Sequence, residues 1–387
     1  IITKEKEYYE HFFSLLNDSK SFLSPLGRLF QSIKFKNQSN NRKNIINYIE
    51  EHPYVLEGGR IDKNNRLLVI TGMHRTGSTL LQNLLSLDPD CRTTILWEMM
   101  DTIPPSQKKS ELYTGGTRAN SISKRIQRTD FLAPGWYHNL ISMHFVSPDC
   151  PEEDEVILFD TFSVWYYTYF LKELDPQLTS MLQKRAPYIC RFLHLYLKLL
   201  DSSYPPNSHW VLKNPDHSQY LNEFLQEFPD ANIIVTHRNP CKVVPSWAKL
   251  LIYIEHMGLL NDFSKLNNLP QPKLLGGAGE WGKTCFSQSL EECIRLVNAR
   301  KELKLTNPKK EKEIFDISFT ELVDNPIQVV KDIYGHFGYE FTSLFERKLK
   351  EYIKNNPSGK YGKTEYSLEE FELKKESVEQ EFSEYIK

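Results

Sequence analysis

Between Leu67 and Pro89, an apolar run, a glycine-bounded loop and a helical pattern follow one another in LLVITGMHRTGSTLLQNLLSLDP. The apolar run predicts a buried strand, and the leucines after the loop recur with the spacing of one helix face. The loop from Gly72 to Thr79 has the pattern G-x-x-R-x-G-S-T. A strand, a tight glycine loop and a helix in this order predict an anion site, because backbone N–H groups and the positive helix end converge there.

The loop departs from the nucleoside-triphosphate pattern G-x-x-x-x-G-K-[ST]. Ser78 stands where that pattern has its lysine, and Arg75 lies three residues earlier. In a kinase the lysine reaches the β- and γ-phosphates, while the following serine or threonine holds Mg²⁺. Without the lysine a P-loop kinase is disfavoured. We expect the forked, permanently charged guanidinium of Arg75 to meet the bridging oxygen of a shorter anhydride.

Four short apolar runs alternate with helical patterns along the chain, at 67–71, 210–213, 232–237 and 313–319. This alternation favours an α/β fold of the P-loop type, with a central parallel sheet flanked by helices on both faces. The strands are short and the connections are long. We therefore expect helical insertions to form a lid over an acceptor site.

The first 60 residues contain two helical patterns, YYEHFFSLL and NIINYIEEH, separated by the polar stretch KFKNQSNNRKN. We expect residues 1–60 to be an N-terminal helical extension packed on the core, and residues 61–387 to form the main domain. The aromatic segment 156–174 and the charged tail 367–386 are both predicted to be helical.

The composition limits the classes of function. A formal net charge of −2 speaks against a nucleic-acid binder. The six cysteines include no C-x-x-C pair, which favours reduced structural thiols over a zinc site. No apolar run reaches the roughly 18 residues that a membrane span needs, and no signal peptide is visible. We therefore expect a cytoplasmic protein, although a chain beginning at Ile1 leaves a lost N-terminal signal open.

A second candidate ligand-binding element follows the strand at 232–237. Arg238 lies at the carboxyl end of this strand, where open α/β sheets place their ligands. Ser246 lies about two turns into the helix that follows. Arg238 alone is also typical of a solvated strand end, but its combination with Ser246 and the first loop favours a role in ligand binding.

A resemblance to the PAPS-dependent sulfotransferases rests on four segments: GMHRTGSTLL, LKNPDHSQYL, FPDANIIVTHRNPCKVVPSW and GKYGKTEYSLEEF. PAPS is 3′-phosphoadenosine 5′-phosphosulfate. The resemblance covers roughly residues 65–385. It points to the branch with arginine in the first loop, which includes bacterial-type small-molecule sulfotransferases and, more distantly, the tyrosylprotein sulfotransferases. It implies that residues 61–387 are a sulfotransferase domain with PAPS as co-substrate.

The resemblance implies a donor site in three parts. The first loop would bind the 5′-phosphosulfate, and the second element would bind the 3′-phosphate. A basic loop near the C-terminus would close over the 3′-phosphate, although an exposed basic loop explains that segment too. The residues implied are, in chain order, Arg75, Thr76, Gly77, Ser78, Thr79, Arg238, Ser246, Lys360, Gly362 and Lys363.

Sulfuryl transfer is an in-line displacement that needs positioning, charge stabilisation and a base. We expect Arg75 to stabilise the leaving oxygen, and the resemblance implies that Lys213 assists at the sulfuryl group. Glu98 is the first choice for the general base by resemblance. His217 is the second, because an imidazole titrates near neutral pH. Fixed cations can neutralise the transferred group, so we expect no metal.

His144 and the acidic run from Glu152 to Glu155 are a third choice for the base, although such a run is also typical of a solvated helix start. The aromatic segment 159–171 suits an apolar or phenolic small-molecule acceptor, and a core helix explains it equally. A homodimer stays open. Two alternatives to a sulfotransferase are a P-loop small-molecule kinase and a non-catalytic nucleotide-binding protein.

Overall fold

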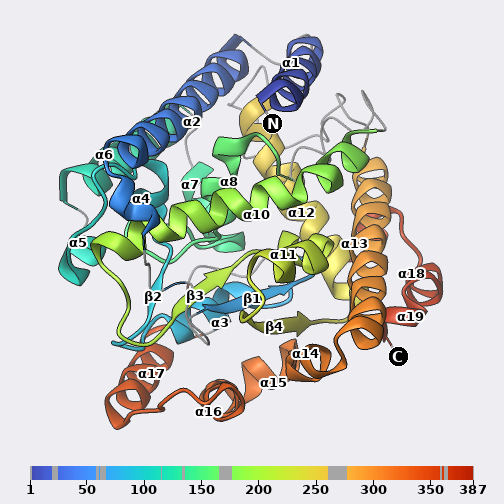
Figure 1. Cartoon of the computed structure of the whole chain (residues 1–387). Helices are drawn as coiled ribbons and strands as arrows, with labels where there is room; N and C mark the ends of the chain where they lie inside the picture. Colours follow the sequence, from blue (N-terminus) through green and yellow to red (C-terminus); the bar gives the residue numbers. More distant parts are fainter. Residues whose placement is uncertain are drawn as a thin grey trace.

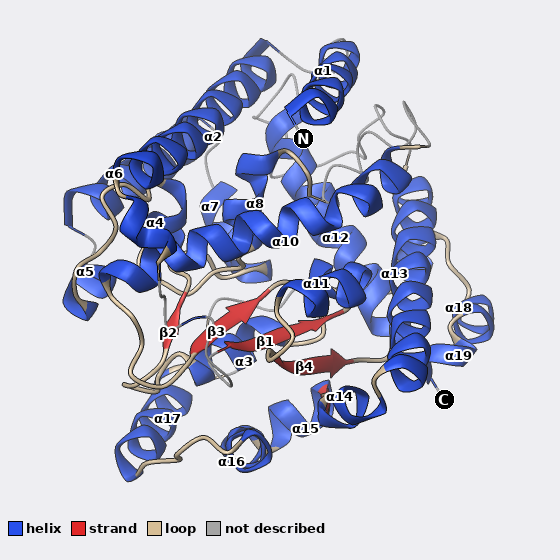
Figure 2. Cartoon of the chain, in the orientation of Figure 1, coloured by secondary structure: helices blue, strands red, loops and turns tan. Residues whose placement is uncertain are grey.

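The computed structural model describes residues 2–19, 25–57, 61, 67–114, 116–132, 136–164, 177–259, 277–357, 360 and 365–386. In this part of the chain, five parallel strands form one sheet in the order β2-β3-β1-β4-β5 (Figures 1 and 2). The predicted α/β class is confirmed. The strands are β1 (Leu67–Gly72), β2 (Arg92–Thr93), β3 (Trp210–Lys213), β4 (Asn232–His237) and β5 (Phe315–Ser318).

Helices cover both faces of the sheet, as predicted (Figure 2). The helices and 3₁₀ turns are α1 (Ile2–Ser19), α2 (Pro25–Glu51), η2 (Pro53–Leu56), α3 (Ser78–Leu85), α4 (Leu96–Met100), α5 (Lys109–Thr114), α6 (Gly116–Leu132), α7 (Trp136–Met143), α8 (Glu155–Leu158), η4 (Phe159–Thr161), α10 (Leu178–Ser203), η6 (Pro215–Tyr220), α11 (Leu221–Glu227), α12 (Pro240–Leu259), α13 (Ala278–Thr306), α14 (Pro308–Glu313), α15 (Phe319–Asp324), α16 (Pro326–Phe337), α17 (Ser343–Asn355), η8 (Glu369–Phe371), α18 (Lys375–Glu381) and α19 (Ser383–Ile386).

The central strand β1 is buried along its whole length because helices cover both of its faces. Leu67 and Val69 join a hydrophobic cluster with α10 and α11 on one face. Leu68 and Ile70 join another with α3, α16 and α17 on the other face. This alternation follows from the two-residue period of a strand. Because β1 is the central strand of the sheet, the first loop starts at the middle of the edge where the strands end.

Gly72 ends β1 in a conformation that requires glycine. Its φ is 128°, and a Cβ atom there would lie 2.5 Å from the carbonyl oxygen of Thr236 on β4. The backbones of β1 and β4 can approach this closely only without a side chain at residue 72. The first loop therefore begins directly beside the end of the strand that leads to Arg238.

The N-terminal helices pack against the main body of the protein. Tyr8, Phe12 and Ile45 belong to the same hydrophobic cluster as α10. The expected polar break between the two helical patterns is wrong, because that stretch lies inside α2. Asn41, within the stretch, donates at 2.8 Å to the Met99 carbonyl and to Asp160, so tertiary hydrogen bonds compensate for its low helix propensity. The boundary at residue 60 stays a prediction.

Two other helix predictions are wrong in part. The helix expected over 156–174 breaks early: α8 and η4 end at Thr161, and Phe162 has a φ of 53°. The Phe162 ring packs instead against aromatic side chains of α1 and α2. Residues 165–176 lie outside the described residues. The tail is also interrupted, because Glu372 has a φ of 56° between η8 and α18.

In the part of the chain that the structure describes, every helix is too short or too polar to cross a membrane.

Candidate active site

Arg75 and Gly77 give the first loop its tight shape. Both have positive φ values, 65° and 91°, so the loop folds back before α3 begins at Ser78. The Arg75 side chain donates through Nε to Ser246 Oγ at 3.2 Å, and through Nη2 to the Met143 carbonyl at 2.7 Å. The loop arginine is thus tied both to α12 and to the end of α7.

Thr76 holds the loop from inside. Its hydroxyl donates to the Met73 carbonyl at 2.7 Å and lies 2.6 Å from the hydroxyl of Thr236 on β4. The side chain is fully buried. If Thr76 binds PAPS, as the resemblance implies, it does so through its backbone, because its side chain is buried and already bonded.

Arg238 lies against the first loop from the neighbouring strand end. Its Nη1 donates to the Arg75 carbonyl at 2.9 Å, and its Nη2 donates to the Tyr366 hydroxyl at 3.2 Å. Its guanidinium carbon lies 4.1 Å from the centroid of the Phe319 ring. Burial lowers the pKa of Arg75, Tyr366 opposes this effect, and Arg238 adds to it. Two clustered guanidiniums of this kind favour a polyanionic ligand.

A cavity of about 560 Å³ opens at this edge of the sheet. One side of it is formed by the first loop, Arg238, Trp247 and Phe319, and four of the predicted loop residues line it: Arg75, Gly77, Ser78 and Thr79. The remaining wall comes from α2, α4, α8, η4 and the segment after α7. The lining residues there are Lys34, Leu96, Met143, His144, Phe145, Val146, Glu152, Glu153, Glu155, Val156 and Phe159.

Lys213 lies at the carboxyl end of β3 with a fully buried side chain. Its Nζ donates to the Thr79 hydroxyl at 3.3 Å and forms an ion pair with Glu153. Burial acts to raise the pKa of Glu153, but the Lys213 ammonium and His144 lower it to about 2. Glu153 therefore stays charged at neutral pH and holds Lys213 beside the first loop.

Glu98 does not line this cavity, although Leu96, two residues earlier, does. The Glu98 carboxylate is fully buried and pairs with Arg92 of β2, with 2.8 Å between Oε1 and Nη2. The ion pair turns this oxygen toward Arg92 and away from the cavity lining. The predicted role of Glu98 as the base has no support in this geometry.

His217 is buried in η6 with both ring nitrogens engaged. Nε2 lies 3.0 Å from Asp154 Oδ2, and Nδ1 lies 2.9 Å from the Tyr220 hydroxyl. Asp154 also accepts a hydrogen bond from Asn214 at 3.0 Å. His217 therefore links η6 to the acidic run and, like Glu98, is absent from the cavity lining.

His144, the third choice from the sequence, lies in the cavity wall together with Glu152 and Glu153. Its Nε2 lies 3.3 Å from each of the two Glu152 carboxylate oxygens. A half-buried imidazole oriented by a carboxylate is a common arrangement of a general base.

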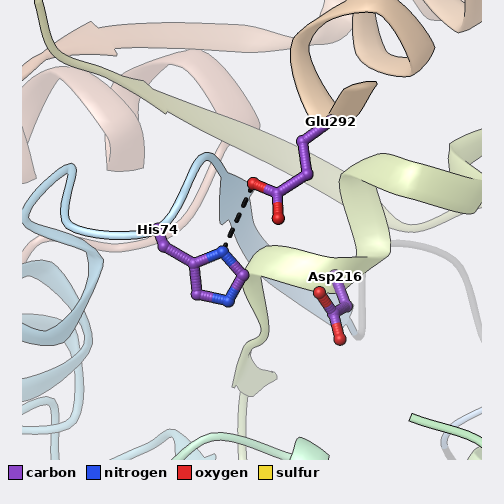
Figure 3. Close-up of side chains that lie close together, drawn as sticks. All are labelled: His74, Asp216 and Glu292. Atoms are coloured by element: carbon purple, nitrogen blue, oxygen red, sulfur yellow. Dashed lines mark hydrogen bonds and ion pairs between the residues drawn. The ribbon is translucent and has the colours of Figure 1, made fainter. Parts of the chain in front are cut away.

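Sequence reasoning missed a buried cluster of His74, Asp216 and Glu292, which come from the first loop, η6 and α13 (Figure 3). His74 Nδ1 lies 3.3 Å from Glu292 Oε2, and the imidazole stacks on Trp247 with 4.1 Å between ring centroids. Burial acts to lower the pKa of His74, but Glu292 raises it overall. Burial raises the pKa of Asp216 to about 6. No sequence signal joins these three segments.

Among the residues that the structure describes, two clusters have the residue types to ligate a metal. In His74, Asp216 and Glu292, and also in His144, Glu152 and Glu153, the candidate ligand atoms lie within 4.8 Å of one another. In both clusters, however, the histidine pairs with a carboxylate of its own cluster.

Of the three residues predicted for the basic C-terminal loop, Lys360 is the one that the structure describes. Its ammonium is exposed and donates to Asn356 Oδ1 at 2.8 Å. Gly362 and Lys363 lie outside the described residues. Lys360 lines a second cavity of about 680 Å³ between α3 and α17, which shares Met143 and Phe145 with the first cavity.

Residues 68–269, more than half of the chain, match the family model described as "Sulfotransferase family". The chain belongs to the sulfotransferase family. It is therefore an enzyme that transfers a sulfuryl group, and the family implies PAPS as the donor. The P-loop kinase and the non-catalytic nucleotide-binding protein are not favoured.

Known relatives of this sulfotransferase agree with the assignment. A Mycobacterium bovis protein named omega-hydroxy-beta-dihydromenaquinone-9 sulfotransferase Stf3 is 22% identical over 318 residues, which are 78% of this chain and 70% of the relative. The crystal structure of sulfotransferase STF9 from Mycobacterium avium has a TM-score of 0.77 at 25% identity, covering 94% of this chain and 86% of its own. STF1 from Mycobacterium tuberculosis has a TM-score of 0.75 at 20% identity, covering 97% and 92%. The resemblance stated from the sequence is confirmed.

Proposed function

We propose that this sulfotransferase transfers the sulfuryl group of PAPS to a hydroxyl of a small apolar or phenolic acceptor, without a metal. One observation carries the proposal. The Arg75 guanidinium joins the first loop to Ser246, while Arg238 binds the Arg75 carbonyl from the next strand. Both predicted anion-binding elements therefore belong to one continuous site, as a ligand with two anionic groups requires.

The donor site uses the cations and hydroxyls of these two elements. The loop N–H groups with Ser78 and Thr79 would bind the 5′-phosphosulfate, and Arg238 with Ser246 would bind the 3′-phosphate. The cavity lining includes Ser78, Thr79 and Arg238, which supports this assignment, whereas Ser246 does not line the cavity and is bonded to Arg75 Nε. Lys360, Gly362 and Lys363 stay a predicted closing loop.

Fixed cations on both sides of the reacting group supply the charge stabilisation. PAPS, when bound, supplies an activated sulfuryl group whose departure leaves negative charge on the bridging oxygen. Arg75, which lines the cavity, would stabilise this charge. Lys213 is held next to Thr79 but does not line the cavity, so it would act on the sulfuryl group through its positive charge. These two protein cations are the reason for proposing transfer without a metal.

We assign the general base to His144. It is in the cavity lining with Thr79, and Glu152 accepts a hydrogen bond from its ring in the protonated form. The imidazole would take the proton of the acceptor hydroxyl as the oxygen attacks sulfur. Glu98 and His217, the earlier choices, are alternatives that mutation can test.

The acceptor side of the cavity supports a small, largely apolar molecule. Leu96, Met143, Phe145, Val146 and Phe159 line it. Such a wall with a few polar groups is typical of small-molecule sites. The name of the mycobacterial relative describes a lipid-like acceptor, which agrees with this lining. A cytoplasmic location and a homodimer stay predictions.

A thermal-shift assay with chelator present tests the donor assignment. We expect stabilisation by the desulfonated donor 3′-phosphoadenosine 5′-phosphate (PAP). Labelled PAPS with an acceptor panel of phenols, sterols, polyketides, sugars and tyrosine peptides then tests transfer. Stabilisation by ATP–Mg²⁺ but not by PAP would overturn the proposal.

A further inference from the structure

His74 joins the first loop to two helices, α12 and α13. Its Nδ1 lies 3.3 Å from Glu292 Oε2 on α13, so an N–H at this position donates to the carboxylate (Figure 3). Its ring stacks on Trp247 of α12, with 4.1 Å between the ring centroids and 17° between the ring planes. The side chain directly before Arg75 is therefore held by a hydrogen bond and by an aromatic ring.

The contacts of His74 lead to elements that also carry predicted donor-site residues. Trp247 directly follows Ser246, whose hydroxyl accepts a hydrogen bond from Arg75 Nε. Asp216, the third member of the buried cluster, lies in η6, which follows β3. Helix α13 packs against both α12 and η6. The side chain of His74 therefore connects the first loop to the elements that surround the site.

The backbone of Arg75 needs such support because it is strained. Its φ of 65° lies in the left-handed region, which is unfavourable for a residue with a Cβ atom. Such a conformation persists only where the surrounding structure imposes it. After Arg75, Thr76 donates to the Met73 carbonyl, and Arg238 donates to the Arg75 carbonyl. Before Arg75, the side chain of His74 supplies the restraint.

We propose that His74 is a positioning residue, which holds Arg75 in the conformation that directs its guanidinium to the leaving oxygen of PAPS. His74 does this through its contacts with Glu292 and Trp247. It also lines the cavity, but its role in this scheme is to support the loop and not to contact the donor. The inference rests on the proposed function, since it requires Arg75 to act on the reacting group.

Two substitutions of His74 separate the hydrogen bond from the ring stacking. His74→Phe keeps an aromatic ring against Trp247 and loses the donor to Glu292. We expect its kcat to fall by about tenfold, the range for one lost hydrogen bond to a charged group, and the Kd of PAP to change less. His74→Asn keeps an amide N–H that can donate to Glu292, so it should retain more turnover than His74→Phe.

A double-mutant cycle tests whether His74 acts through Arg75. In Arg75→Ala the guanidinium is absent, so adding His74→Phe should leave kcat within about twofold of the Arg75→Ala value. A direct contact of His74 with the donor would instead give the same loss in both backgrounds. That additive result would overturn the proposal, and so would an unchanged kcat of His74→Phe alone.

Glu292→Leu removes the same hydrogen bond from the other partner. We expect it to lower kcat in the same direction as His74→Phe, and again without further effect in the Arg75→Ala background. It takes the place of His74→Phe in the cycle if that variant does not fold.

A second histidine–glutamate pair provides a matched control. His194 pairs with Glu227 between α10 and α11, and neither residue lines the cavity. His194→Phe therefore removes a comparable contact away from the site and should leave kcat unchanged. In every variant kcat is taken per PAP-binding molecule, so partial unfolding does not count as a loss of turnover.

A crystal structure of His74→Phe gives a test that needs no acceptor. We expect Arg75 Nε to lie beyond hydrogen-bond distance of Ser246 Oγ, and an unchanged contact would overturn the role of His74. Failure of the wild-type enzyme to bind PAP, or to transfer from PAPS, would contradict the proposed function itself. Normal PAP binding and transfer with an additive cycle would overturn only this inference.

Discussion

The Nε of Arg75 donates to Ser246 Oγ at 3.2 Å, which ties the first loop to helix α12 across 171 residues of sequence. The carbonyl of Arg75 also accepts a hydrogen bond from Arg238 Nη1 at 2.9 Å. These two hydrogen bonds therefore connect the two predicted anion-binding elements directly. A substitution in either element is expected to disturb the other, so donor binding and turnover should not separate completely.

Arg238→Ala should mainly weaken donor binding. The proposed 3′-phosphate contact is remote from the reacting sulfur, and the loss of one charge-assisted hydrogen bond costs about 1.5–3 kcal/mol. Calorimetric titration with PAP measures this loss, and Ser246→Ala should follow the same direction. Wild-type PAP affinity in both variants would show that the second element does not bind the 3′-phosphate.

Arg75→Ala should reduce turnover more than donor affinity. Its charge acts on the leaving oxygen, where negative charge develops only in the transition state. Steady-state kinetics with PAPS, together with PAP binding, measure the two effects separately. An unchanged kcat with a raised KM for donor would make Arg75 a binding residue only.

Glu153 predicts a specific pH dependence of stability. Its pKa in the folded protein is about 2, below the value near 4.5 of a free glutamate. The paired carboxylate therefore stabilises the fold above pH ~4.5, and this contribution is lost as the pH falls through that range toward about 2. The denaturation midpoints of wild type and Glu153→Gln should converge on acidification from about pH 6 to 3. A constant difference would contradict the assigned pKa.

How much the sequence predicted depends on how far apart the cooperating residues lie. The strand, loop and helix around Arg75 form a contiguous segment, so their order was recognisable. Arg238 and Ser246 were also recognisable, because a fixed spacing after a strand places both at the sheet edge. The contact of Lys34 with the cavity depends on how α2 packs, which no local pattern contains.

The choice of base shows the same limit at shorter range. His144 and Glu152 lie eight residues apart in an irregular segment, where no helix or strand period tells which side chains meet. Glu98 stands near the first loop in sequence, yet its short helix turns the carboxylate toward Arg92. Proximity in sequence alone therefore does not show which of the candidates lies beside the cavity.

His144→Asn should fold, bind PAP normally and lose roughly 10²–10⁴-fold in turnover, the range typical of a removed general base. Asparagine keeps a polar group beside Glu152 but accepts no proton. Added imidazole should restore part of the activity, which a purely structural role would not allow. Unchanged turnover would exclude His144 as the base and return attention to the other candidates.

Glu98→Gln is the complementary experiment, because the geometry predicts a loss of stability rather than of chemistry. The substitution removes the charge that pairs with the fully buried Arg92 guanidinium. Breaking one side of a buried ion pair costs about 3–5 kcal/mol, since the remaining charge stays desolvated. Urea denaturation should show this loss, while kcat per folded, PAP-binding molecule should stay near the wild-type value. His217→Asn, measured beside it, should behave in the same way because both of its ring nitrogens are held within the fold. If Glu98→Gln instead keeps wild-type stability and loses turnover with PAP binding intact, Glu98 is the base, and the cavity must rearrange when substrates bind.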